Sequence, residues 1–361
     1  MALLRNLAVG AVALAGAGLG GSYVITPGSV TKEQTITIDR PVATVFALLA
    51  STPEQAPVAE GITQTVTALD LRKTVEASVG FAGTKSAKVE YGLTAAAAAP
   101  GATAPSAGAT TVVIKVTQSL GLNPVERSQG GAGAQLEPVV AALAAWADTE
   151  AKKTPTADFS DLVYEVANVP ARPYLYLEGS TTKGEGQITE GARQASAILR
   201  TVFASNNLQM TNPIAVETAW TGDTYGFNFG MPYTGQRPNV LIGVKAGETP
   251  SGTAIKVAYT GAEATIVPDV YDKIDALIAA TRLTEGTNFE EFLDDPTQTG
   301  GSRNRFVYYI VTGNTEALKN IAPPATAPAM PVTPATVTPT PAPGETPATP
   351  EPAPAPAPEK K

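Results

Sequence analysis

The stretch Phe289-Glu290-Glu291-Phe292-Leu293-Asp294-Asp295-Pro296 decides the fold of the second half of the chain. Its first five residues predict a strand, and Asp294-Asp295-Pro296 predicts the turn that ends this strand. Phe306–Val311 predicts the returning strand, so the two segments form a hairpin. Two adjacent aspartates without a third ligand make a poor calcium loop, so we interpret them as a turn and predict no metal site.

The same order of elements occurs twice between Phe159 and Thr312. The first copy has strands at Val163–Val169 and Tyr174–Glu178, a helix at Ile188–Asn206, and a hairpin of Ala215–Trp220 and Gly226–Pro232. The second copy has a strand at Ala254–Tyr259, a helix at Pro268–Arg282, and the hairpin described above. Two strand–helix–hairpin halves predict a pseudo-twofold α+β domain, and a cleft between such halves is a natural ligand site.

A second globular segment precedes this one, from about Ser29 to Lys153. The predicted strands are Gln34–Ile38, Ile62–Leu69, Thr74–Val79, Ala87–Leu93 and Thr111–Gln118. Apolar residues at helical spacing predict a short helix over Pro41–Ala50 and a longer one over Gln135–Ala151. The fold class is therefore α+β, with an antiparallel sheet and a long C-terminal helix in residues 29–153, followed by the pseudo-twofold domain in residues 159–312.

The N-terminal segment, residues 1–28, is apolar apart from Arg5. Residues 7–25 contain only apolar, small or weakly polar side chains, and their length is close to the ~20 residues that span a bilayer. Both a cleavable signal peptide and an uncleaved membrane anchor fit this pattern. Ser22 stands where a lipoprotein would need cysteine, which excludes lipid attachment. We predict a location in the periplasm or at the periplasmic face of the inner membrane.

The C-terminal segment, residues 320–361, is rich in proline and alanine. From Pro323 onward it holds 14 of the 31 prolines. Proline fixes φ and removes a backbone donor, which predicts a disordered, polyproline II-like tail. Such a tail can reach across an envelope space or dock with an envelope protein partner.

The composition excludes several classes of chemistry. The chain has no cysteine and no histidine, so it has no disulfide, thiol nucleophile, Cys/His zinc site or histidine base. The 25 Lys+Arg against 33 Asp+Glu give a net charge of −8. Nucleic-acid binding needs clustered basic residues, so we predict no nucleic-acid partner. No pattern indicates a cofactor.

The first domain resembles the START-like, or polyketide-cyclase-like (SRPBCC), helix-grip family. Thr35–Leu49 matches the family's opening strand, turn and helix, and Asn123-Pro124 precedes the final helix as in that family. The resemblance implies a curved antiparallel sheet around a long helix. The segment Ser51–Glu60 lacks the aromatic residues that usually follow the first helix.

The second domain resembles the gyrase-inhibitor-like small-molecule-binding domain, also called the AraC-type effector-binding domain. The matching stretches are Val169-Pro170-Ala171, Val257–Gly261, Tyr271–Ile274, Phe289–Pro296 and Val307–Val311. The chain departs from the family at four places: Tyr259 replaces histidine, Ala262 replaces proline, Phe292 replaces tyrosine, and the closing strand lacks its usual acid and has Arg303 and Arg305 nearby.

This resemblance implies a carboxylate in an aromatic-lined cleft that binds a small organic ligand, cationic or aromatic. Glu290 matches the carboxylate. The candidate walls are Tyr259, Phe292, Trp220, Tyr225, Phe229 and Tyr308. Tyr308 and Tyr309 are neighbours on one strand and face opposite sides, so only one of them can line the cleft.

Three functions fit these patterns. The leading hypothesis is a non-enzymatic, exported or membrane-anchored protein that binds a small molecule in its second domain. The first alternative is a hydrolase of small electrophiles, with Glu290 as base and Tyr259 or Tyr308 as proton donor. The second alternative is an envelope scaffold that acts through its Pro-rich tail. We assign no catalytic residue.

Overall fold

The computed structural model describes residues 28–82, 85–97, 108–120, 131–182, 187–222, 224–238, 243–297 and 303–322. The predictions for residues 7–25, Asn123-Pro124 and the Pro-rich tail lie outside these ranges and stay predictions. Among the helices within these ranges, none combines the length and apolarity that crossing a membrane requires.

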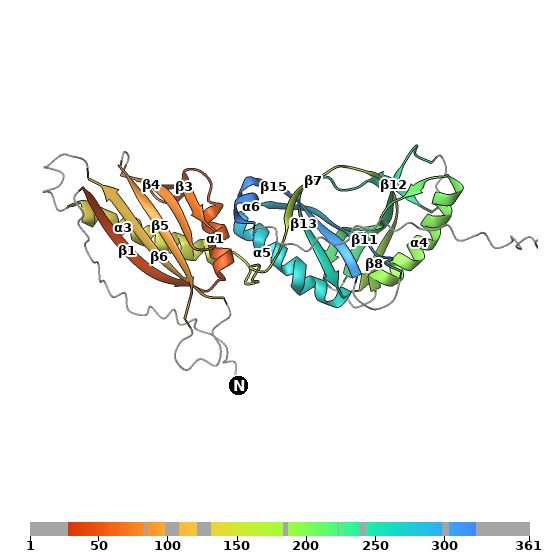
Figure 1. Ribbon diagram of the computed structural model, residues 1–361, viewed down its shortest axis with the longest axis horizontal. Coiled ribbons are helices and arrows are strands. Elements are labelled where there is room, and N and C mark those ends of the chain that lie inside the picture. The colour runs from red at the N-terminus through yellow and green to blue at the C-terminus, as the bar shows by residue number, and fades with distance from the viewer. Residues whose placement is uncertain are drawn as a thin grey trace, which may run out of the picture.

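The first domain is a curved six-stranded antiparallel sheet with the order β1-β6-β5-β4-β3-β2. The strands are β1 (Ser29–Ile38), β2 (Ala56–Ala59), β3 (Ile62–Asp70), β4 (Thr74–Phe81), β5 (Lys85–Ala95) and β6 (Thr110–Ser119). A short helix, α1 (Val42–Ala50), follows β1, and the long helix α3 (Gly131–Lys152) packs along β1 and β6. Figure 1 shows this sheet curving around α3. The predicted antiparallel sheet with a long C-terminal helix is confirmed, and β2 was not predicted.

The space between this sheet and α3 is filled by side chains. Val75, Tyr91 and Ile114 from the strands and Leu136 and Leu143 from α3 are completely buried. Period-two alternation along each strand places these residues on the helix side, and their burial supplies the main stabilisation of the domain.

The second domain is built on a nine-stranded antiparallel sheet within the described residues. Its main order is β12-β8-β11-β10-β14-β15-β13-β7, and β9 pairs with β11. The strands are β7 (Glu165–Val169), β8 (Pro173–Thr182), β9 (Gln209–Met210), β10 (Ile214–Thr221), β11 (Thr224–Thr234), β12 (Lys245–Glu248), β13 (Gly252–Gly261), β14 (Thr284–Phe292) and β15 (Arg303–Thr312). The helices are α4 (Gln187–Ser205), the short η1 (Glu263–Thr265), the π-helical turn η2 (Val267–Tyr271), α5 (Asp272–Thr281) and α6 (Glu316–Ile321).

The pseudo-twofold arrangement is confirmed. One half consists of β8, α4 and the hairpin β10–β11, and the other of β13, α5 and the hairpin β14–β15. The halves meet where β10 pairs with β14, with Ala215 opposite Glu290. The predicted helix over Pro268–Arg282 differs in one respect: it begins as the π-helical turn η2 and becomes α-helical only at Asp272.

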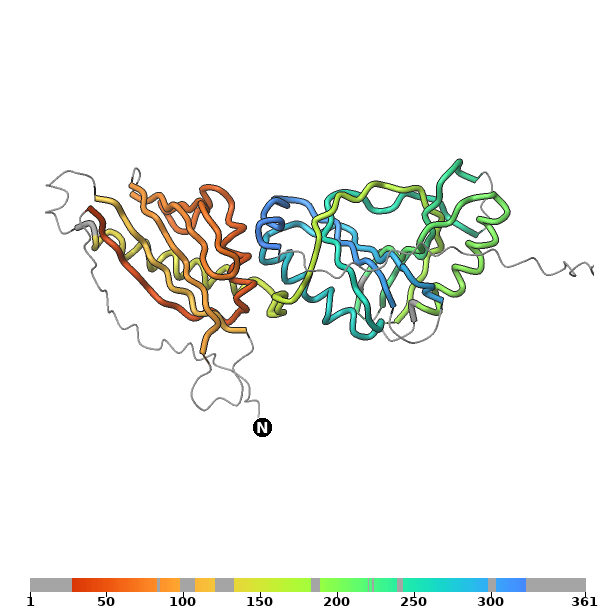
Figure 2. The backbone as a smooth tube through the Cα atoms, viewed as in Figure 1, coloured from red at the N-terminus to blue at the C-terminus, as the bar shows by residue number. Residues whose placement is uncertain are grey.

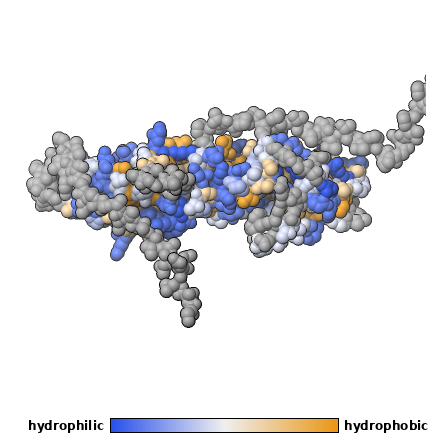
Figure 3. All heavy atoms as spheres, turned by 90° about the horizontal axis from the view of Figure 1, so that it is seen from below, coloured by the Kyte–Doolittle hydropathy of each residue, from blue (hydrophilic) through white to orange (hydrophobic). Residues whose placement is uncertain are grey.

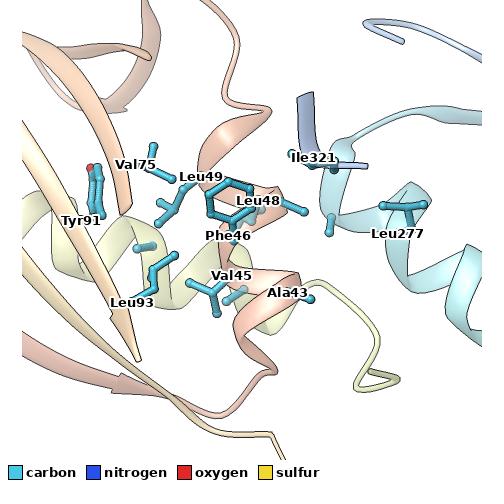
Figure 4. Packing of buried hydrophobic residues seen from close by; sticks show 14 of the residues in the cluster. Ala43, Val45, Phe46, Leu48, Leu49, Val75, Tyr91, Leu93, Leu277 and Ile321 are labelled. Atoms are coloured by element: carbon cyan, nitrogen blue, oxygen red, sulfur yellow. The ribbon is translucent and has the colours of Figure 1, made fainter. Parts of the chain in front are cut away.

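The two domains lie end to end and pack through helices. Figure 2 shows the chain passing from the first domain to the second through the segment after α3. Helix α1 contacts α5 and α6, and Figure 4 shows Leu48 of α1 pointing toward the segments that carry Leu277 and Ile321. These three residues belong to one hydrophobic cluster that continues from the first domain into the second. On the face seen in Figure 3, apolar residues form small scattered patches rather than one broad surface.

Candidate functional site

The two faces of the second sheet carry different groups. Along β14, Glu290 points toward the helices, where the Tyr271 hydroxyl reaches it, and Phe289 points to the other face. Phe289 stacks on Tyr308 there, with ring centroids 4.5 Å apart and an interplanar angle of 8°. Strand alternation produces this division, so Glu290 and Phe289 serve different surroundings.

Glu290 is buried, with 3% of its surface exposed, and both of its carboxylate oxygens accept hydrogen bonds. The Tyr271 hydroxyl donates to Oε1, and Arg305 Nη1 donates to Oε2 at 2.6 Å. In the β14–β15 register, Phe292 is opposite Arg305 and Glu290 is opposite Val307. Glu290 and Arg305 are therefore diagonal neighbours, a distance that long side chains can bridge.

Arg305 lies at the seam between the two halves of the domain. Its guanidinium carbon is 5.9 Å from the ring centroid of Tyr259, and 5.3 Å from that of Phe292. Tyr259 belongs to the core packed around α5, whereas Phe292 belongs to the core packed on α4. Only 1% of Arg305 is exposed, and its Nε and Nη2 atoms have no hydrogen-bond partner among the described residues.

The charges of this group follow from its burial. Burial by itself lowers the pKa of Arg305, but the charge and hydrogen bond of Glu290 outweigh that effect and raise the pKa above its usual value. Burial, followed by the negative charge of Glu290, raises the pKa of Tyr271 well above its ordinary value. At neutral pH Arg305 is therefore charged, and Tyr271 is a neutral donor. Tyr271 is the last residue of the π-helical turn, a rare conformation that is frequent at functional sites.

Three acidic residues of the second domain, Glu217, Asp275 and Glu285, have raised pKa values. Burial raises the pKa values of Glu217 on β10 and Glu285 on β14, and the nearby Asn288 side chain opposes the rise at each. Burial, then the charge of Glu285, raises the pKa of Asp275 on α5 to about 6. Within the described residues, these and the other acids form no group close enough to hold a metal ion.

The structure brings together three of the predicted site residues, Glu290, Tyr259 and Phe292, around Arg305. Phe229 is fully buried on the same face, 6.3 Å from Phe292 between ring centroids, and Tyr225 is buried in the same cluster. Trp220 lies on β10 opposite Tyr225, and its side chain is outside what the structure describes.

Tyr308 is on the other face of the sheet from Glu290, where its hydroxyl donates to Glu291 at 3.1 Å. Its neighbour Tyr309 faces the helices instead, with its ring 5.8 Å from that of Tyr271. The Tyr259 hydroxyl lies 2.6 Å from the hydroxyl of Thr265 and makes no hydrogen bond to Glu290 among the described residues. Neither predicted proton donor therefore contacts Glu290.

Sequence reasoning missed the two residues that do bind Glu290. Tyr271 stood in a matched stretch, and Arg305 was noted as a basic residue near the closing strand, but nothing in the sequence joined either to Glu290. Only the register of β14 against β15 places Arg305 next to Glu290, and the sequence does not fix that register. The predicted turn at Asp294-Asp295-Pro296 is present: Asp294 Oδ2 accepts from the Asn304 backbone N–H at 2.7 Å, and Asp295 Oδ1 accepts from that of Thr297 at 3.0 Å.

Comparison with known proteins gives structural neighbours only. No protein-family model matches the chain. No curated protein matches it by sequence.

Solved structures that align with part of this chain include a hydrolase from Listeria innocua. It aligns at 12% identity over 43% of this chain and 95% of its own, with a TM-score of 0.31. The EcmrR C-terminal domain aligns at 11% identity over 42% of this chain and 99% of its own, with a TM-score of 0.36. SAV2435 bound to tetraphenylphosphonium aligns at 12% identity over 42% of this chain and 96% of its own, with a TM-score of 0.31.

The resemblance of the first domain to the START-like family stays a prediction.

Proposed function

We propose that the second domain binds a small organic molecule on the helix face of its sheet, at the Glu290–Arg305 pair. The observation that carries this proposal is a buried ion pair at the seam of two pseudo-symmetric halves, bordered by the rings of Tyr259 and Phe292. The gyrase-inhibitor-like pattern of the sequence supports the same conclusion, because that family uses the position of Glu290 for ligands.

Stability alone does not account for such a pair. Taking two charges out of water costs several kcal/mol each, and well-packed apolar side chains of similar volume often stabilise a fold as well or better. Val307 and Tyr309 follow Arg305 on the same face of β15 and are buried, so this face of the strand accepts apolar and aromatic residues. A buried ion pair bordered by the rings of Tyr259 and Phe292 supports a binding role.

The hydrolase alternative has less support. Glu290 and its predicted proton donor would have to face one substrate. Tyr308 is on the other face of the sheet, where its hydroxyl donates to Glu291, and the Tyr259 hydroxyl is hydrogen-bonded to that of Thr265. The scaffold alternative and the exported location depend on residues 7–25 and on the Pro-rich tail, and they stay predictions.

Ligand-induced stabilisation of the full chain tests the proposal. Three probes share one naphthalene ring and differ in charge: 2-naphthoate, 2-naphthamide and trimethyl(2-naphthyl)ammonium. A ligand that binds the native state raises the melting temperature, so we expect at least one of these probes to do so. The double variant Glu290→Gln/Arg305→Met should abolish the rise. It removes both members of the ion pair and leaves neither charge uncompensated, so it should fold.

The matched control is Glu190→Gln/Arg193→Gln, which removes an exposed ion pair from the outer side of α4. This variant should keep the full ligand response. The proposal is contradicted if no probe stabilises the protein, or if the Glu290→Gln/Arg305→Met variant responds as strongly as the control.

A further inference from the structure

Arg305 carries buried hydrogen-bond donors that have no partner among the described residues. A guanidinium has five N–H groups, and those on Nη1 face Glu290. The Nε and Nη2 atoms are buried and have no partner among the described residues, although nearly all buried donors in folded proteins have one. A charged donor buried without a partner is costly, so this edge of Arg305 suits a group that the described residues do not supply.

The geometry of the Nε and Nη2 atoms of Arg305 determines which chemical group can bind to them. Nε and Nη2 are neighbours on one side of a rigid planar guanidinium, and their N–H bonds form a fork. This fork matches the two oxygens of a carboxylate, which it binds through two parallel hydrogen bonds. Lysine carries the same charge but cannot present this fork.

We propose that Arg305 binds the carboxylate of a small aromatic acid, so that the ligand of the second domain is an anion rather than a cation. This inference rests on the proposed function and specifies its ligand. It reverses the preference that the family resemblance implies, and the cause is Arg305, a buried cation on a closing strand that lacks the family's usual acid.

A cationic ligand fits the same site poorly. Glu290 would have to bind it, yet the positive charge of Arg305 already lies 2.6 Å from Glu290 Oε2 and would repel a second cation there. Displacing Arg305 would leave a buried positive charge without its partner, which is strongly destabilising. A carboxylate on the free edge of Arg305 leaves the pair with Glu290 intact.

Aromatic surfaces border the fork on two sides. The rings of Tyr259 and Phe292 flank the guanidinium, and Phe229 extends this surface beyond Phe292. Aromatic rings pack favourably against one another in stacked or edge-on arrangements. A ligand with an aromatic ring next to its carboxylate can therefore use the fork and the rings together.

Two further features lie on the same side of the domain. The hydroxyl of Ser196, on the inner face of α4, is a second buried polar group without a partner among the described residues. Helix α4 is joined to η1 by a hydrogen bond from Thr189 to Glu263, and its 3.3 Å length is near the outer limit for hydroxyl donors. Separating α4 from η1 at this weak contact would open a route toward Arg305.

Isothermal titration of the full chain with the three naphthalene probes tests this inference. We expect 2-naphthoate to bind about tenfold more tightly than the amide or the ammonium, because only the carboxylate satisfies both arms of the fork. Arg305→Lys keeps a positive charge next to Glu290 but removes the fork of N–H donors. It should therefore lower the affinity for 2-naphthoate by about tenfold or more. The control Arg193→Lys, on the exposed side of α4, should leave the affinity unchanged.

The ranking of the three probes is measured on the unaltered protein, so it does not depend on how any variant folds. If the ammonium or the amide binds as tightly as 2-naphthoate, the inference is wrong although the proposed function stands. The same holds if Arg305→Lys folds and binds 2-naphthoate with full affinity. If no probe binds, both the inference and the proposed function are wrong.

Discussion

At the scale of single residues, the buried carboxylate of Glu290 is stabilised by hydrogen bonds from protein side chains rather than from water. Tyr271 reaches it from the π-helical turn and Arg305 from the adjacent strand. Each hydrogen bond therefore ties a different element to the centre of the sheet. Removing one donor should loosen that element without disturbing the other.

We predict that Tyr271→Phe lowers the free energy of unfolding by about 1.5–3 kcal/mol, because it removes a buried hydrogen bond to a charged group. Chemical denaturation measures this change. The control is Tyr233→Phe, because the Tyr233 hydroxyl has no hydrogen-bond partner among the described residues, and it should change stability by less than ~0.5 kcal/mol. Equal effects of the two substitutions would show that the Tyr271–Glu290 contact carries no stability.

The site residues show what sequence alone could supply at this scale. Glu290 was found because it stands in a specific stretch, Phe289–Pro296. Its ion pair with Arg305 could not be found, since the partner is set by the register of β14 and β15. Ten residues, 293–302, connect these strands, so the turn does not fix which residues of β15 lie opposite those of β14.

At the scale of secondary-structure elements, helix α4 is held against its sheet by two glycines. The Phe227 ring on β11 lies between Gly179 on β8 and Gly191 on α4. A Cβ at either glycine would stand 2.8 Å from Phe227 Cζ, closer than real side chains approach. Phe227 is buried, so its ring has no room to move away.

We therefore predict that Gly191→Ala destabilises the protein by about 1–3 kcal/mol through overpacking, despite the ~1 kcal/mol that alanine contributes to an isolated helix. Denaturant titration measures the sign directly. Adding Phe227→Leu should recover part of the loss, so that the double variant is more stable than the sum of the two single changes. A stabilising Gly191→Ala would mean that α4 does not pack on Phe227 as described.

Most elements were predictable because hydrophobic periodicity is local. The strands and helices of both halves of the second domain, and the sheet and long helix of the first, follow from period-two and helical spacing. The π-helical turn was not predictable in this way. Val270 and Ile274 keep helical spacing through it, so the pattern read as one helix from Pro268 to Arg282, and only the backbone hydrogen bonds distinguish η2 from α5.

At the scale of the whole molecule, the two domains share one core. The cluster that contains Phe46 and Leu48 of α1 also contains Leu277 of α5 and Ile321 of α6. A hydrogen bond also joins the two domains beside this cluster: the Ser51 hydroxyl donates to the Ala280 carbonyl oxygen at 3.1 Å. This interface fixes α5, and with it the turn that carries Tyr271, against the first domain. The first domain therefore supports the candidate site of the second.

Arg282 tests this coupling. It ends α5 in the left-handed conformation, with φ of 57°, and donates from Nη1 to the Leu48 carbonyl oxygen at 3.1 Å while Nη2 lies 3.7 Å from Glu150. Glycine prefers this backbone conformation, so Arg282→Gly removes the two polar contacts that Arg282 makes with the first domain without straining the chain. We predict a loss of about 1–2 kcal/mol in the free energy of unfolding. In calorimetry, the two domains should then unfold in separate transitions.

The control is Asn207→Gly, which makes the same backbone change at φ of 53° after α4, on an exposed residue. It should leave the unfolding transition unchanged. If Arg282→Gly unfolds like Asn207→Gly, the domains are not coupled through this residue.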